Sequence, residues 1–198
     1  MGDGLGNDDD ITGLALAGSC GDTDATVRFI NATQRDVHRF VAGLVGAREA
    51  DDLTQETYLR ALRALPNFAG RSSARTWLLS IARRAAADHI RAVVRRPRTS
   101  QTSDWELTVE RAVTVPGFED PVLLRELVLA LEPDRREAFV LTQMLDLSYA
   151  DAATVCGCPI GTIRSRVARA RTDLIAALDT SRVGDGSPRS ISGAADRG

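Results

Sequence analysis

Apolar residues recur every three or four positions along almost the whole chain of 198 residues, and no stretch alternates long enough to form a convincing strand. Between residues 25 and 44, for example, the apolar side runs through Ala25, Phe29, Val37 and Leu44. Similar stripes fall within residues 53–65, 74–89, 123–131, 138–145 and 148–178. This periodicity predicts an all-α protein built from amphipathic helices.

The helical period lapses over RRPRTSQTSDWELTVERAVTVPG, which gathers Pro, Ser, Thr and Gly. We therefore expect two small helical domains joined by a flexible linker. Neither end of the chain offers an apolar face to bury. The predicted segments are an acidic disordered N-terminus (1–9), a first domain (10–97), the linker (98–119), a second domain (120–178) and a disordered tail (179–198).

Residues that cap or stop helices mark several element ends. Asp22 or Asp24, and Ser72 or Ser73, are expected to cap the helices that follow them, and Pro66 ends the helix before it. Later in the chain, Ser148 with Asp151 three residues on resembles a capping box, and a glycine-containing turn separates two short helices. This last pair predicts a helix-turn-helix.

Charge is segregated along the chain, although the formal net charge is only −2. Residues 1–24 carry six Asp and no Arg, whereas residues 67–98 carry eight Arg against one acid. Residues 99–134 carry eight acids and two Arg, and GTIRSRVARAR at 161–171 has four Arg and no acid. All 25 basic residues are Arg. Basic blocks on an otherwise balanced chain indicate a nucleic-acid-binding protein.

Other classes of protein are disfavoured. Three cysteines are too few for a disulfide framework, no apolar run approaches a membrane span, and the N-terminus is acidic where a signal peptide is basic. A soluble cytoplasmic protein is expected. No catalytic, phosphate-binding or metal-ligand spacing occurs, so we expect no enzyme activity, cofactor or metal. Cys156 and Cys158 lack further ligands, and their role stays open.

The last helix has a buried stripe of Ile163, Val167, Ala170 and Leu174. The opposite side carries polar residues, with Arg164 and Arg171 at its flanks. Such a helix fits the major groove of DNA, where Arg reads guanine edges or holds phosphates. The residues expected on this side are Thr162, Ser165, Arg166 and Arg169.

Three stretches, taken together, resemble the extracytoplasmic-function (ECF) type of RNA polymerase sigma factor in the sigma-70 family, and among its members the mycobacterial sigma C type. They are DDLTQETYLRAL, the run F-x-G-x-S-S-x-R-T-W-L-L-S-I-A-R, and SYADAATVCGCPIGTIRSRVARAR. The resemblance covers about residues 10–178 and implies a sigma-two domain, a linker and a sigma-four domain. It implies core RNA polymerase (β′ coiled coil and β flap) and promoter DNA as partners.

The resemblance also implies residue roles. Polymerase contact falls on Asp52, Gln55, Glu56 and Leu59. Capture of the −10 element falls on Asn67, Phe68, Arg71, Ser72, Arg75, Arg84, Asp88 and Arg91. Recognition of the −35 element falls on Thr162, Arg164, Ser165, Arg166 and Arg169.

Some alternatives stay open. Many members carry Asn where this chain has Arg84, and Arg84, Asp88, Arg91 and Arg95 are also spaced as an intrahelical ion-pair ladder. A stand-alone dimeric helix-turn-helix regulator is the competing function. The resemblance leaves open an anti-sigma factor as a partner, and the acidic segments could screen the DNA-binding arginines.

Overall fold

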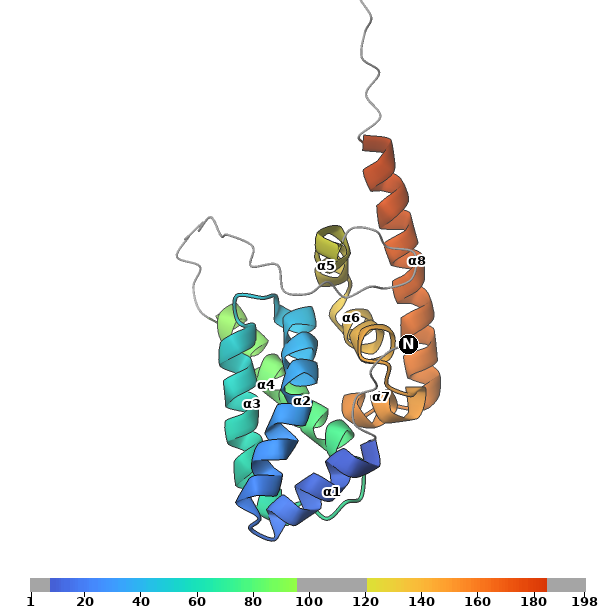
Figure 1. Ribbon diagram of the computed structural model, residues 1–198. Helices are drawn as coiled ribbons and strands as arrows, with labels where there is room; N and C mark the ends of the chain where they lie inside the picture. Colours follow the sequence, from blue (N-terminus) through green and yellow to red (C-terminus); the bar gives the residue numbers. More distant parts are fainter. Residues whose placement is uncertain (1–7, 96–120, 185–198) are drawn as a thin grey trace, which may run out of the picture.

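The computed structural model describes residues 8–95 and 121–184, and every regular element within these ranges is helical (Figure 1). The all-α prediction is confirmed. The predicted linker at 98–119 lies outside the described residues. The first range contains α1 (Asp8–Ser19), α2 (Thr23–Val45), α3 (Ala50–Ala64), the 3-10 turn η1 (Leu65–Asn67) and α4 (Ala74–Arg95). The second contains α5 (Pro121–Ala130), α6 (Pro133–Phe139), the π-helical η2 (Val140–Met144), α7 (Tyr149–Cys156) and α8 (Ile160–Gly184).

Local capping sets the ends of several helices. The Asp22 carboxylate accepts a hydrogen bond from the Ala25 amide at 2.9 Å at the start of α2. The Ser148 hydroxyl accepts one from the Asp151 amide at 3.0 Å and donates to the Asp151 carboxylate at 2.5 Å, so Ser148 caps α7 as expected. Gly157 ends α7 with a φ of 65°, a left-handed conformation that glycine adopts without a steric penalty.

Helix α1 starts inside the segment that the sequence predicts to be disordered. Its first turn carries three acids, Asp8 to Asp10, which a helix N-terminus favours. Ile11 and Ala15 are buried, and the Thr12 hydroxyl accepts a hydrogen bond from the Ala74 amide at 3.0 Å. Because α1 caps α4 through Thr12, it belongs to the first helical unit. At the other end of the chain, α8 runs past the predicted boundary to Gly184.

The two helical units pack against each other. Helix α2 contacts α5, α6 and η2, while α4 contacts α7, and the buried apolar side chains form one cluster that runs through both units. A Cβ atom added to Gly43 in α2 would lie 2.9 Å from Val140 Cγ2, so glycine permits the close approach of α2 to η2.

Arginines of both units form hydrogen bonds or ion pairs across the contact between the two helical units. We call this packing of the two units the closed arrangement. Arg75 Nη2 lies 2.6 Å from Asp36 Oδ2 and donates to the Leu145 carbonyl at 2.6 Å. Four further contacts cross the same boundary. They are Arg39 Nη2 to the Met144 carbonyl (2.6 Å), Arg136 Nη1 to the Leu44 carbonyl (2.6 Å), Arg83 Nε to Glu137 Oε1 (2.7 Å) and Thr76 Oγ1 to Asp151 Oδ1 (3.3 Å).

The ion pair of Arg75 and Asp36 generates a stability prediction, because the two side chains are only 8% and 5% exposed. Asp36→Asn leaves a buried guanidinium without its counter-ion, which we expect to lower the free energy of unfolding by about 3–5 kcal/mol. The control is Arg60→Gln, which breaks exposed pairs and is expected to lower it by at most about 1 kcal/mol. Urea denaturation of the full chain measures both, and equal losses would contradict the prediction.

Candidate nucleic-acid interface

Helix α8 presents an exposed face made by its N-terminal half. The stripe of Ile163, Val167, Ala170 and Leu174 is buried against the second unit. At roughly 100° per residue, Ser165 lies opposite this stripe. Arg164, Ser165 and Arg169 are exposed, Thr162 is half-buried, and the Ser165 hydroxyl donates to the Thr162 carbonyl at 2.9 Å. Within residues 8–95 and 121–184, neither the Arg164 nor the Arg169 guanidinium has a protein hydrogen-bond partner, so both are available to a ligand.

The other two arginines of this stretch are held by neighbouring elements. Arg166 pairs through Nη2 with Asp134 Oδ2 in α6 and donates through Nη1 to the Cys158 sulfur at 3.7 Å. Arg171 donates to the Gln143 side-chain oxygen at 2.5 Å. The sequence places Arg166 on the exposed face and Arg164 at its flank, whereas the structure exposes Arg164 and half-buries Arg166. Both bound arginines lie beside the buried stripe, within reach of α6 and η2.

Helix α3 carries the predicted polymerase contacts on one side. Asp52 and Gln55 are exposed, Glu56 is half-buried, and Leu59 is 52% exposed although it lies among polar residues. The residues 52, 55, 56 and 59 are three or four positions apart, which brings them to one face of the helix. The structure therefore gathers all four on one accessible surface, the α3 patch.

Ion pairs connect the α3 patch to α4. Arg60 contacts Glu56 at 2.8 Å and Asp88 at 2.7 Å, and Arg91 contacts Asp88 at 2.5 Å. Hydrogen bonds from Arg60 and then Arg91 hold the pKa of Asp88 below its usual value. Asp88 is thus a bridge between two helices. It is not bonded to Arg84, which donates instead to the Ser80 carbonyl at 3.1 Å.

The eight residues of the predicted −10 set separate into accessible and buried groups. The exposed members lie in the turn before α4 and along its outer side, and Ser72 is half-buried. Together with Ser72, the exposed members form what we call the α4 surface. The exposed members are Asn67, Arg71, Arg84, Asp88 and Arg91.

Phe68 and Arg75 are buried, each with 7% of its surface exposed. Phe68 packs on Trp77 with 4.9 Å between ring centroids and 46° between ring planes. Arg75 is enclosed between Asp36 and the Leu145 carbonyl. The sequence gives no sign of the burial of Arg75, because its partners Asp36 and Leu145 lie 39 and 70 positions away. Phe68, in contrast, packs on a residue nearby in the chain. In the closed arrangement neither side chain can touch a nucleic-acid strand.

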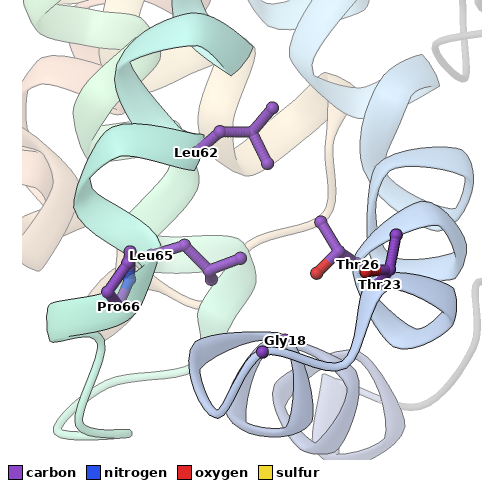
Figure 2. A pocket seen from close by; sticks show the side chains of 7 residues that line it. Gly18, Thr23, Thr26, Leu62, Leu65 and Pro66 are labelled. Atoms are coloured by element: carbon purple, nitrogen blue, oxygen red, sulfur yellow. The ribbon is translucent and has the colours of Figure 1, made fainter.

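An open pocket of about 240 Å³ lies where α1 ends, α2 begins and α3 ends (Figure 2). Its lining contains no titratable side chain and none of the predicted site residues. The lining residues are Gly18, Gly21, Thr23, Thr26, Leu62, Leu65 and Pro66.

No cluster of His, Cys, Asp or Glu among the described residues could hold a metal ion. Across the same residues, no helix combines the length and the apolar character that crossing a membrane requires. Burial raises the pKa of the Cys156 thiol, which therefore stays protonated in the core.

Two family models match the chain in the order of its two helical units. Residues 29–96 match Sigma-70 region 2, and residues 122–174 match Sigma-70, region 4. The first range covers the α3 patch and the α4 surface, and the second covers α8 as far as Leu174.

Known proteins agree with these matches. The chain is 56% identical over 170 residues to a probable RNA polymerase sigma-C factor of Mycobacterium bovis, covering 86% of this chain and 92% of that protein. It is 33% identical over 162 residues to the ECF RNA polymerase sigma-E factor of Escherichia coli, covering 76% and 85%. Its fold matches the sigma factor RpoE of Bartonella quintana, solved with the anti-sigma factor NepR, with a TM-score of 0.65, 28% identity, and 79% and 98% of the two chains covered. The chain therefore belongs to the sigma-70 family of RNA polymerase sigma factors, in its ECF group.

Proposed function

We propose that this chain binds core RNA polymerase and directs promoter-specific transcription initiation by recognising −10 and −35 elements, acting in the cytoplasm as a non-enzymatic subunit. The observation that carries the proposal is the presence of two unlike basic surfaces on two successive units, one on α8 and one on α4. Two different surfaces suit two different DNA elements. A dimeric regulator would instead repeat one surface across a palindrome.

The α3 patch is our candidate for polymerase binding. Leu59 offers an apolar contact at one end of the patch, and Asp52, Gln55 and Glu56 supply acceptors and charge along the helix before it. Protein interfaces commonly combine apolar and polar contacts. None of these four side chains is buried in the core of its own unit, so all are accessible to a partner, and Glu56 also pairs with Arg60 at 2.8 Å.

The exposed face of α8 is our candidate for −35 recognition. Arg164 and Arg169 lie on either side of Ser165, and the small residues Ser165 and Ala168 allow close approach of the helix to DNA. Arginine forks suit guanine edges and phosphates, and a recognition helix contacts base edges through its N-terminal residues. Arg164 therefore reads bases in this proposal, and Arg169 lies one turn further along.

The α4 surface is our candidate for binding the melted −10 strand. Arg71, Arg84 and Arg91 provide exposed positive charge. Arg75 and Arg83 are meanwhile bound to Asp36 and Glu137 in the closed arrangement. We infer that the two units separate before these last two arginines contribute, because Glu137 and the Leu145 carbonyl belong to the second unit.

Polymerase binding is tested by the double variant Gln55→Ala, Glu56→Ala. Loss of two partner contacts is expected to weaken binding to core polymerase at least about tenfold with helix content unchanged. A matched control is Asp24→Ala, Gln34→Ala, which removes one acid and one amide from exposed positions of α2. Titration of labelled full-length chain with core polymerase measures both, and equal affinities for the two double variants would refute the role of the α3 patch.

The −35 role is tested by Arg164→Ala in the reconstituted complex with core polymerase. We expect a loss of about 1–3 kcal/mol in binding to −35 duplexes and a relaxed preference at one or two positions. Arg28→Ala removes an exposed arginine from α2 and serves as the control. An unchanged −35 preference in the Arg164 variant would mean that α8 does not read the element.

A further inference from the structure

We propose that Asp134 determines −35 selectivity by holding Arg166 away from the DNA, and thereby acts as a positioning residue. The inference rests on the proposed role of α8 in −35 recognition. It assigns the selectivity of the helix to a carboxylate on a different element, α6, which precedes the helix-turn-helix.

The contacts of Arg166 carry the first step. One nitrogen of its guanidinium pairs with Asp134 and another donates to the Cys158 sulfur, so both ends of the fork are engaged by the protein. The Arg166 side chain is 21% exposed, whereas Arg164 and Arg169 are exposed and have no protein partner among the described residues. Arg166 therefore differs from its neighbours by its partner and not by its place in the sequence.

The position of Arg166 on α8 gives the second step. Thr162 and Arg169 are four residues before and three residues after it, so all three follow one side of the helix. A guanidinium released at residue 166 would reach the same side of the exposed face. Arginine side chains are long enough to swing from a protein partner to an adjacent phosphate or base edge. Release would add one cation to the surface that contacts DNA.

Asp134 can control this release because its side chain is 52% exposed, at the margin of the proposed DNA surface. If DNA took Arg166, the carboxylate would be left unpaired beside a polyanion, which is unfavourable. The ion pair of Asp134 and Arg166 therefore opposes a contact between Arg166 and DNA. An ion pair at the surface is weak, so its removal is expected to change the affinity for −35 DNA by roughly two- to tenfold.

The chain supplies a matched control on the same two helices. Arg135 of α6 pairs with Asp173 of α8 at 2.6 Å, and the Asp173 side chain is 40% exposed against 52% for Asp134. Asp173 lies roughly two turns beyond Arg166, away from the exposed face at the start of α8. Asp173→Asn and Asp134→Asn each remove one negative charge from this helix pair, and only the second frees Arg166.

The experiment uses full-length chain with core polymerase and a promoter library randomised in the −35 element. Asp134→Asn is expected to raise the affinity for promoter DNA roughly two- to tenfold and to shift the base preference at one or two positions of the −35 element. It is also expected to steepen the slope of log affinity against log salt concentration by about one unit. The double variant Asp134→Asn, Arg166→Ala should lose both the gain and the shift. Asp134→Glu, which keeps the carboxylate, should retain the original preference, and Asp173→Asn should show no shift in preference.

The proposal is overturned if Asp134→Asn matches Asp173→Asn in preference and salt dependence, or if its effects persist without Arg166. Circular dichroism of each variant separates these outcomes from loss of folding, and Asp134→Glu provides the comparison that stays folded. Arg164→Ala, tested with the same library, separates the role of α8 in −35 recognition from the role of Asp134. If it leaves −35 preference intact, the role of α8 fails; if it alters preference while Asp134→Asn does not, only the role of Asp134 fails.

Discussion

The guanidinium of Arg75 joins the two helical units, and the closed arrangement depends on it. It lies in α4 and has 7% of its surface exposed, between the Asp36 carboxylate of α2 and the Leu145 carbonyl that follows η2. A buried cation is tolerated only when paired and hydrogen-bonded. The first unit supplies the charge partner and the second supplies the carbonyl, so separating the units keeps the pair with Asp36 and removes the Leu145 acceptor. The freed donor of Arg75 then becomes available to water or to another acceptor.

Other arginines use main-chain carbonyls in the same way. Arg39 reaches the Met144 carbonyl at the end of η2, and Arg136 reaches the Leu44 carbonyl in the last turn of α2. The last carbonyls of a helix lack partners within it, and a planar fork with five donors suits them better than a lysine ammonium. Burial lowers the pKa of both arginines, and both are still expected to be charged at neutral pH because arginine titrates so far above it. Arginine content alone therefore overstates the positive charge available to nucleic acid.

Local features could be predicted from the sequence, and features that join distant segments could not. The helices, the N-cap at Ser148 and the stripe containing Ile163 depend on residues within a turn or two, so periodicity and capping rules predict them. The burial of Arg75 depends on Leu145, seventy positions away, and no local pattern encodes that distance. Helix α1 begins two residues inside the segment predicted to be disordered, and its place in the first unit depends on the burial of Ile11 and Ala15 and on the distant bond from Ala74 to Thr12.

The recognition helix shows how tertiary contacts decide which charges a surface offers. Four arginines occur between residues 161 and 171, and each could reach DNA if α8 were isolated. The two beside the buried stripe, Arg166 and Arg171, meet acceptors on α6 and η2, which face that stripe. Arg164, which lies on nearly the same side of the helix as Arg171, and Arg169 meet none among the described residues. The acceptors that neighbouring elements present therefore sort chemically identical side chains into bound and available ones, and a change in α6 can alter the DNA surface without touching α8.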